Sequence, residues 1–197
     1  GSRRSLDIPI AELYTNTPVC MPVHVVRGKR DGPCMFVSAA IHGDEINGVE
    51  IIRRLLKHSG LSRLKGTLIA VPIVNVFGFL NHSRYLPDRR DLNRCFPGSE
   101  KGSLAARLAH TFISEIVSNA QFGIDLHTAA GHRNNLPHIR ANMDDELTER
   151  LAHAFGTPVI VNSNIIDKSL RQVADDMGVT MLLYEAGEAL RFDEVCI

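Results

Sequence analysis

Short hydrophobic runs alternate along this chain with stretches in which hydrophobic residues recur every three or four positions. Runs typical of strands lie at 19–26, 35–41, 67–74, 122–126, 158–161 and 180–184. Helical spacing is found at 46–60, 104–116, 145–155 and 170–177. Strands that alternate with helices in this way predict an α/β fold. We expect three layers, α/β/α, with a central mixed, mostly parallel sheet and helices on both of its faces.

The connection between residues 75 and 102 does not fit this alternation. It is long and irregular, and it contains Arg84, Arg89, Arg90 and Arg94. Most connections inside a compact domain are far shorter, and long ones commonly carry function. We therefore expect this segment to contribute to a binding or catalytic site.

Composition and charge exclude several classes of protein. The chain has 197 residues with 22 basic and 22 acidic side chains, so its formal charge is zero and gives no electrostatic reason to bind nucleic acid or anionic lipid. The hydrophobic fraction of 44% is typical of a globular protein. The longest apolar stretch, 66–80, is interrupted by Pro72 and Asn75 and is too short to cross a bilayer. We expect neither a nucleic-acid nor a membrane partner.

The four cysteines bear on the cellular compartment. Cys20, Cys34, Cys95 and Cys196 are scattered, without a CxxC pair or a close-spaced framework. This usage favours a reducing environment over a secreted disulfide scaffold, so we expect a cytoplasmic protein. The sequence leaves open whether the chain forms a homo-oligomer.

A candidate metal site follows the ends of two predicted strands. His42 ends one strand and Glu45 enters the first turn of the next helix, while His127 ends a second strand. Sites in open α/β sheets form beyond the carboxyl ends of the strands, where these side chains would meet. Two imidazoles and one carboxylate are a ligand set of catalytic zinc, with a fourth position open for water. An isolated HxxE also arises by chance, and a histidine after a strand is often only hydrogen-bonded.

A third predicted strand delivers a carboxylate to the same edge of the sheet. The apolar run 181–184 leads directly to Glu185. Because burial of an unpaired carboxylate is costly, such a residue needs a partner or a function. Beside a zinc-bound water, Glu185 would be a general base that later protonates the leaving nitrogen. The alternative is a salt bridge to an arginine. Glu188 competes for the role of base but is expected in solvent.

Arg84, Asn93 and Arg94 are candidates for binding a substrate. Guanidinium groups bind carboxylates bidentately and stay charged, and the amide of Asn93 adds a donor. Together they suit a substrate with a carboxylate beside a polar carbonyl, and one arginine could stabilise an oxyanion. The alternative is that the arginines form only a solvated basic loop.

Three other histidines and one cysteine are weaker candidates. His82, His132 and His138 have no companion at ligand spacing, so we expect them at the surface or outside the ligand set. Cys95 has no dedicated base beside it, and we expect a small packed thiol rather than a nucleophile.

Five motifs follow one another along most of the chain, within roughly residues 35 to 190: His42-Gly-Asp-Glu45, Arg84-Tyr85, Asp91-Leu-Asn93-Arg94, Asp125-Leu-His127 and Glu185-Ala-Gly187. Together and in this order they resemble the succinylglutamate desuccinylase/aspartoacylase family, a branch of the zinc carboxypeptidase-like superfamily. The resemblance implies a zinc-carboxypeptidase-like fold in which His42, Glu45 and His127 hold one Zn²⁺ ion per chain.

The same resemblance implies roles for the remaining motif residues. Glu185 would be the general base. Arg84, Asn93 and Arg94 would bind the substrate carboxylate or polarise the scissile carbonyl, with Arg84 as the first candidate for a catalytic role. The implied reaction is hydrolysis of the amide that joins an acyl group to an amino acid or related amine. The expected partner is therefore a small N-acyl amino acid or N-acyl amine.

The resemblance also bears on domain organisation. Members of this family usually carry a second, β-rich domain after the catalytic one, whereas this chain ends at Ile197, soon after Glu185. We therefore expect residues 1–197 to be a zinc-dependent catalytic domain without that β-rich C-terminal domain. The acyl group, the amine and the activity of this part alone stay open.

Three other functions also stay open. A carboxypeptidase or amidase could apply the same zinc chemistry to a peptide-like substrate. A non-catalytic module could sense an acylated metabolite or a metal, but it would not need Glu185. A cysteine hydrolase centred on Cys95 would be inactivated by thiol alkylation and would be indifferent to chelators.

Overall fold

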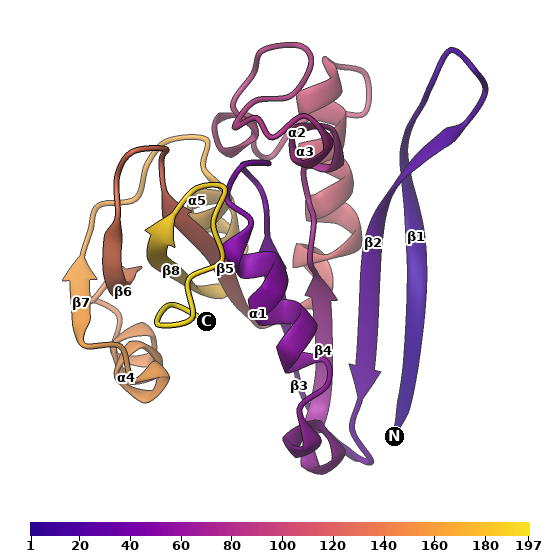
Figure 1. Ribbon diagram of the computed structural model, residues 1–197. Coiled ribbons are helices and arrows are strands. Elements are labelled where there is room, and N and C mark those ends of the chain that lie inside the picture. Colours follow the sequence, from indigo (N-terminus) through magenta and orange to yellow (C-terminus); the bar gives the residue numbers. More distant parts are fainter.

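Eight strands lie side by side in one sheet in the computed structural model, which describes all 197 residues. The order across the sheet is β1-β2-β4-β3-β5-β8-β6-β7 (Figure 1). Their bounds are β1 Ser2–Glu12, β2 Pro18–Arg27, β3 Arg30–Ala39, β4 Lys65–Val71, β5 Phe122–Ala129, β6 Asn135–Ala141, β7 Val159–Asn162 and β8 Thr180–Glu188. The pairs β3/β4, β3/β5, β5/β8 and β6/β7 are parallel, and the other three pairs are antiparallel. The predicted mixed, mostly parallel sheet is confirmed.

Five α-helices accompany the sheet. They are α1 Asn47–Leu55, α2 Val76–Leu80, α3 Leu104–Glu115, α4 Glu146–Phe155 and α5 Leu170–Asp176. Short 3₁₀ turns lie at η1 Ser59–Arg63, η2 Leu92–Arg94 and η3 Val117–Asn119. None of these helices has the length and apolarity needed to cross a membrane.

Two hydrophobic clusters, one on each face of the sheet, form the core. Leu108 and Phe112 of α3 and Leu170 of α5 belong to a cluster of 23 buried residues. Ile52 of α1 and Ala152 of α4 belong to a second cluster of 14. The two pairs of helices therefore cover opposite faces (Figure 1), which confirms the three-layer arrangement.

Two strands of the sheet were not predicted. In β1 the hydrophobic residues Leu6, Ile8 and Ile10 recur at every second position, but much of this edge strand is exposed. In β6 the pattern is broken by Pro137 and by an irregularity in its pairing with β8. Edge position and irregular pairing both weaken the alternation that a buried strand shows.

The central strands also run further than expected. Strand β5 continues to Ala129 and β8 to Glu188, so His127 and Glu185 lie within strands, near their carboxyl ends, rather than after them. These two residues are Cα partners in the parallel β5/β8 pair. The register of the sheet therefore places the candidate ligand and the candidate base next to each other.

The irregular connection after β4 contains short helical segments. Helix α2 and the turn η2 both lie between residues 75 and 102. Asn75 caps α2 through a hydrogen bond from Gly78 N to its side chain at 2.8 Å, and Asp91 caps η2 through Asn93 N at 2.9 Å. Side chains of Asn and Asp at these positions satisfy backbone N–H groups that the short helices leave free.

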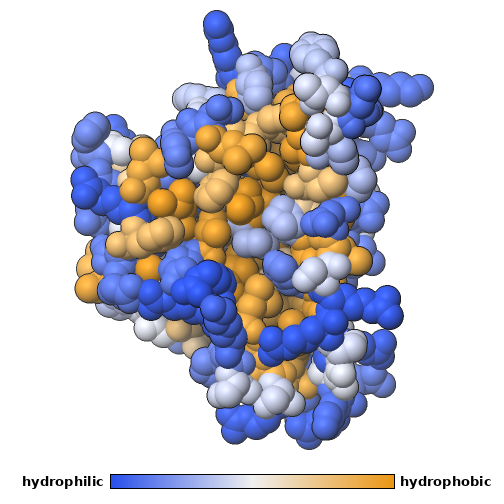
Figure 2. All heavy atoms as spheres, turned by 45° about the vertical axis from the view of Figure 1, so that its right-hand side comes forward, coloured by the Kyte–Doolittle hydropathy of each residue, from blue (hydrophilic) through white to orange (hydrophobic).

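Hydrophobic side chains also reach the surface on the side of the molecule that carries the β1–β2 hairpin. Figure 2 shows a hydrophobic strip across the middle of this face, with hydrophilic side chains around it. The large hydrophobic residues exposed in the first 80 positions are Leu6, Leu13, Tyr14 and Leu80. Exposed apolar side chains are common in folded proteins, and these lie outside the set that lines the candidate site.

Candidate active site

A tight turn carries the first two candidate ligands from the end of β3 into α1. His42 and Glu45 are both buried, at 4% and 2% exposure. Gly43 between them packs against the backbone of α2, because a Cβ added there would lie 1.9 Å from the carbonyl carbon of Gly78. Only glycine permits this close approach, so the turn and α2 hold each other in place.

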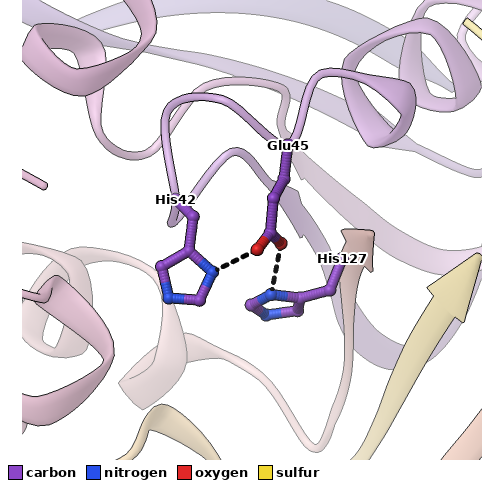
Figure 3. Close-up of side chains that lie close together, drawn as sticks. All are labelled: His42, Glu45 and His127. Atoms are coloured by element: carbon purple, nitrogen blue, oxygen red, sulfur yellow. Dashed lines mark hydrogen bonds and ion pairs between the residues drawn. The ribbon is translucent and has the colours of Figure 1, made fainter. Parts of the chain in front are cut away.

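The three predicted ligands meet in one buried cluster. His42 Nδ1 lies 2.7 Å from Glu45 Oε1, and His127 Nδ1 lies 2.8 Å from Glu45 Oε2 (Figure 3). One ligand atom from each residue lies within 4.8 Å of the other two. The cluster is the one group of three or more His, Cys, Asp or Glu residues in the structure with this geometry, and it can hold a metal ion.

The Nε2 atom of each histidine lies within hydrogen-bond distance of a carboxylate. His127 Nε2 lies 2.6 Å from Asp125 Oδ2, and His42 Nε2 lies 3.2 Å from Asp91 Oδ1. A carboxylate at Nε2 fixes the proton on that nitrogen and leaves Nδ1 free for a metal. Both Nδ1 atoms face Glu45, so the donor set of two imidazole nitrogens and one carboxylate oxygen fits zinc.

The charges of the cluster are strongly coupled. Burial disfavours the ionised form of Glu45, but the neighbouring His127 and His42 outweigh this and lower its pKa to about 2. Burial also opposes protonation of His42 and His127, yet the carboxylates around each raise both pKa values. Metal ligation requires imidazole nitrogens without a proton, so a cation bound at the two Nδ1 atoms would take the place of any protons held there. The negative charge of Glu45, buried between the two imidazoles, favours a cation at this position.

Glu185 lines the same pocket as the cluster. Its pKa is raised, chiefly because the carboxyl is desolvated by burial, while the charge of His127 opposes the shift. The predicted alternative of a salt bridge to an arginine is not seen, because the hydrogen bond to its carboxylate comes from Asn135 Nδ2 at 2.9 Å. The competing Glu188 accepts from His132 N and pairs with Arg191 instead.

Arg84 reaches the pocket from the long connection. Its Nη2 donates to Asp91 Oδ2 at 2.9 Å, and its Nη1 lies 3.4 Å from Glu45 Oε1. The side chain keeps 30% of its surface exposed, so it is not fully enclosed by these acids. Arg84 therefore both holds Asp91 in place and presents a guanidinium beside the candidate metal site.

Asn93 and Arg94 also line the pocket. The side-chain oxygen of Asn93 accepts a hydrogen bond from Leu170 N at 2.9 Å, so it is committed to the start of α5. Its amide nitrogen stays available as a donor. Arg94 contacts the carbonyl oxygen of Asn93 and is otherwise exposed.

The weaker candidates lie elsewhere or lack an activating partner. His82, His132 and His138 are not part of the ligand cluster. The thiol of Cys95 donates to the carbonyl of Asp91 at 3.2 Å, and burial raises its pKa. A raised pKa keeps the thiol protonated, so Cys95 is not an activated nucleophile.

Two further arginines in the pocket were not predicted. Arg171 is buried, and its guanidinium contacts Ser163 Oγ at 2.8 Å and backbone carbonyl oxygens, with no acidic partner. Arg140 on β6 lines the same pocket without a hydrogen-bond partner. Burial and the charge of Arg140 lower the pKa of Arg171, although arginine stays charged. Their sequence context gives no signal, because only the tertiary fold brings β6 and α5 to the pocket.

Asp125 could have been predicted as a partner of His127. Residues two apart on a strand share a face, so the spacing of Asp125 and His127 already places the two side chains together. The structure extends this contact by one step, since Ser38 Oγ on β3 donates to Asp125 Oδ1 at 2.8 Å.

Comparison with known proteins finds relatives over most of the chain. Residues 31–197 match the model of the succinylglutamate desuccinylase/aspartoacylase catalytic domain. The N-alpha-acetyl-L-2,4-diaminobutyric acid deacetylase of Halomonas elongata is 28% identical over 149 residues, which cover 73% of this chain and 43% of that protein.

Solved structures show the same fold. A succinylglutamate desuccinylase/aspartoacylase from Rhodobacter sphaeroides superposes with a TM-score of 0.87 at 27% identity, over 98% of this chain and 61% of the other. The product-bound ectoine utilization protein EutE (DoeB) from Ruegeria pomeroyi superposes with a TM-score of 0.88 at 24% identity, over 98% of this chain and 62% of the other, and indicates the fold alone. The chain spans less than two thirds of the length of each of these relatives. On the family match, the motifs and the fold, the chain belongs to the succinylglutamate desuccinylase/aspartoacylase catalytic-domain family.

Proposed function

We propose that this chain is the catalytic domain, over residues 1–197, of a zinc-dependent hydrolase that cleaves the amide bond of an N-acyl amino acid or related N-acyl amine. The observation that carries the proposal is the placement of the buried His42–Glu45–His127 cluster in one pocket with Glu185 and four arginines. A site that only bound a metal would not need a free carboxylate and cationic groups beside it. Membership of the family and the deacetylase relative support the same reaction class.

His42, Glu45 and His127 would hold the zinc ion. Bound there, zinc would supply Lewis acidity and bring the pKa of a water molecule towards ~7. The chain's own contribution is to fix the ligands, since Asp125 and Asp91 hold the two imidazoles by Nε2. Ligands fixed in advance bind a metal more tightly and with a defined geometry.

Glu185 would move the protons of the reaction. It lies in register with His127 on the neighbouring strand, so its carboxylate can take a proton from the attacking water and pass it to the leaving nitrogen. The raised pKa of Glu185 lies closer to neutral pH than its ordinary value, which suits a group that must both accept and return a proton.

The arginines would bind and polarise the substrate. Arg84, beside Glu45, is placed to stabilise negative charge that develops on the scissile carbonyl oxygen. Arg94, Arg140 and Arg171 have no acidic partner within ion-pair distance, and carboxylates are the groups that a guanidinium binds best. We therefore propose that these three arginines bind the substrate carboxylate, with the Asn93 amide as an additional donor.

A substrate panel tests the proposal. The zinc-loaded protein is assayed with N-acetyl and N-succinyl amino acids, N-acetyl diamines that lack a carboxylate, and short peptides. We expect amide hydrolysis of N-acyl amino acids that is abolished by a chelator and restored by zinc. Preference for peptides would favour a carboxypeptidase or amidase, and zinc-independent hydrolysis sensitive to thiol alkylation would contradict the proposal.

A further inference from the structure

Strand β6 places an amide directly against the carboxylate of Glu185. Asn135 Nδ2 donates to Glu185 Oε2 at 2.9 Å, whereas Glu185 Oε1 makes no hydrogen bond. The two oxygens of the carboxylate therefore have different surroundings. Oε2 is bound by Asn135 of β6, and Oε1 is available to a group in the pocket.

An irregularity in β6 aims the Asn135 side chain. Asn135 is the Cα partner of Gly187 and His138 that of Glu185, so β6 advances three residues where β8 advances two. The extra residue is a β-bulge, and bulges beside active sites re-aim side chains. Pro137 lies in the bulge, where a missing N–H costs no ladder hydrogen bond.

The bulge changes the face to which Asn135 belongs. In a regular strand, residues three apart point to opposite faces of the sheet. His138 shares the face of its cross-strand partner Glu185, so without the extra residue Asn135 would point away from that carboxylate. The hydrogen bond between Asn135 and Glu185 thus depends on the bulge.

A neutral donor suits this position better than a cation. The charged or titratable groups that act on Glu185 are His127 on β5, Glu45, and Arg140 and His138 on β6. An arginine paired directly with Glu185 would lower the basicity of the carboxylate. An amide restricts its rotation without adding a positive charge.

We propose that Asn135 is a positioning residue that holds Glu185 Oε2, so that Glu185 Oε1 faces the reacting atoms as the proton acceptor. The proposal rests on the function proposed above for Glu185. It assigns a purpose to the bulge at Leu136–Pro137, which neither the motifs nor the ligand cluster requires.

Substitution of Asn135 gives the first test. In the zinc-loaded protein, Asn135→Ala should lower kcat about tenfold and leave KM within about twofold, because substrate contacts are kept while the base loses its fixed orientation. Asn135→Asp has the same shape but no donor, and it should lower kcat further. Asn134→Ala, at the exposed neighbouring position, is the matched control and should leave both constants unchanged.

A second readout does not depend on turnover. The side-chain carboxyl resonance of Glu185, assigned by its loss in Glu185→Gln, is titrated by ¹³C NMR in zinc-loaded and metal-free protein. Because Asn135 donates to the charged form, Asn135→Ala should raise the pKa of Glu185 by about one unit, while Asn134→Ala should not change it. The melting temperature of each variant is measured alongside.

The outcomes separate the possibilities. An unchanged pKa of Glu185 in Asn135→Ala overturns the proposal, and a lower melting temperature without that shift shows a purely structural role for Asn135. If the parent hydrolyses no amide, the proposed function fails, and the titration still decides whether Asn135 acts on Glu185.

Discussion

The half-buried Glu185 is the residue on which the proposed chemistry depends most. Glu185→Gln keeps the size and shape of the side chain but replaces the carboxylate, which can accept a proton, with an amide, which cannot. We expect turnover to fall about 100-fold or more, with zinc affinity unchanged, because the side chain is not a ligand. Glu188→Gln, on the same strand but outside the pocket, is the control and should keep near-parent turnover. A Glu185→Gln variant as active as the parent would remove Glu185 from the mechanism.

The pH dependence of turnover follows from the same residue. Burial is the main cause that raises the pKa of Glu185 above its ordinary value of 4.5. A general base acts only when it is ionised, so kcat should fall as the pH drops through this raised pKa. Rate profiles measured at saturating substrate should therefore show an acidic limb with its midpoint above 4.5. A midpoint at or below that value would contradict a base whose pKa is raised by partial burial.

Asp125 provides a residue-scale test of the metal site. Asp125→Asn keeps the shape of the side chain but removes the negative charge beside His127 Nε2. In the parent, the same carboxylate also accepts a hydrogen bond from Ser38 Oγ. We expect zinc affinity to fall by about 10- to 100-fold, measured by competition with a chelator of known affinity. Asp144→Asn, at an exposed position, should have no effect. Equal affinities for Asp125→Asn and the parent would show that Asp125 does not orient the ligand.

At the scale of elements, the turn between β3 and α1 sets the position of two ligands at once. The backbone of Gly43 packs so closely on Gly78 of α2 that a side chain cannot fit. Gly43→Ala should therefore move the turn or α2, weakening zinc binding and lowering the melting temperature together. Gly131→Ala, at a loop glycine with open space around it, is the control. A normal zinc affinity in Gly43→Ala would show that the turn does not depend on this contact.

Most of the elements that build the site were predictable from sequence, because they are buried and periodic. Each of β3, β5 and β8 contains a short run rich in buried hydrophobic residues, so the positions of His42, His127 and Glu185 near the carboxyl ends of these runs followed from the pattern. Helix α3 was equally clear from Ser103, which caps it by accepting from Ala106 N at 3.2 Å.

The elements that were missed lack those signals. Strand β6 contains a proline and a bulge, and its contribution to the site, through Asn135 and Arg140, depends on pairing with β8 fifty residues later. Arg171 sits on a helix whose start is fixed by Asn93 from the long connection. Such contacts depend on tertiary structure, and a single sequence carries no local pattern that predicts them.

At the scale of the whole molecule, the sheet gathers chemistry from segments far apart along the chain. Strands β3, β5 and β8 are adjacent and parallel, so their carboxyl ends deliver His42, His127 and Glu185 to one edge. The long connection supplies Arg84 and Asp91 from one side of this edge. The charged groups buried at this edge are tolerated because each is paired, Glu45 with both histidines and the histidines with Asp125 and Asp91.

The central claim is that His42, Glu45 and His127 together hold one zinc ion, and zinc stoichiometry tests it most directly. Purified protein is stripped with a chelator, reloaded with zinc, dialysed and measured by elemental analysis, beside His127→Ala treated in the same way. The account predicts about one zinc per chain in the parent and almost none in the variant. A parent that retains no zinc, or a variant that retains a full equivalent, would contradict it.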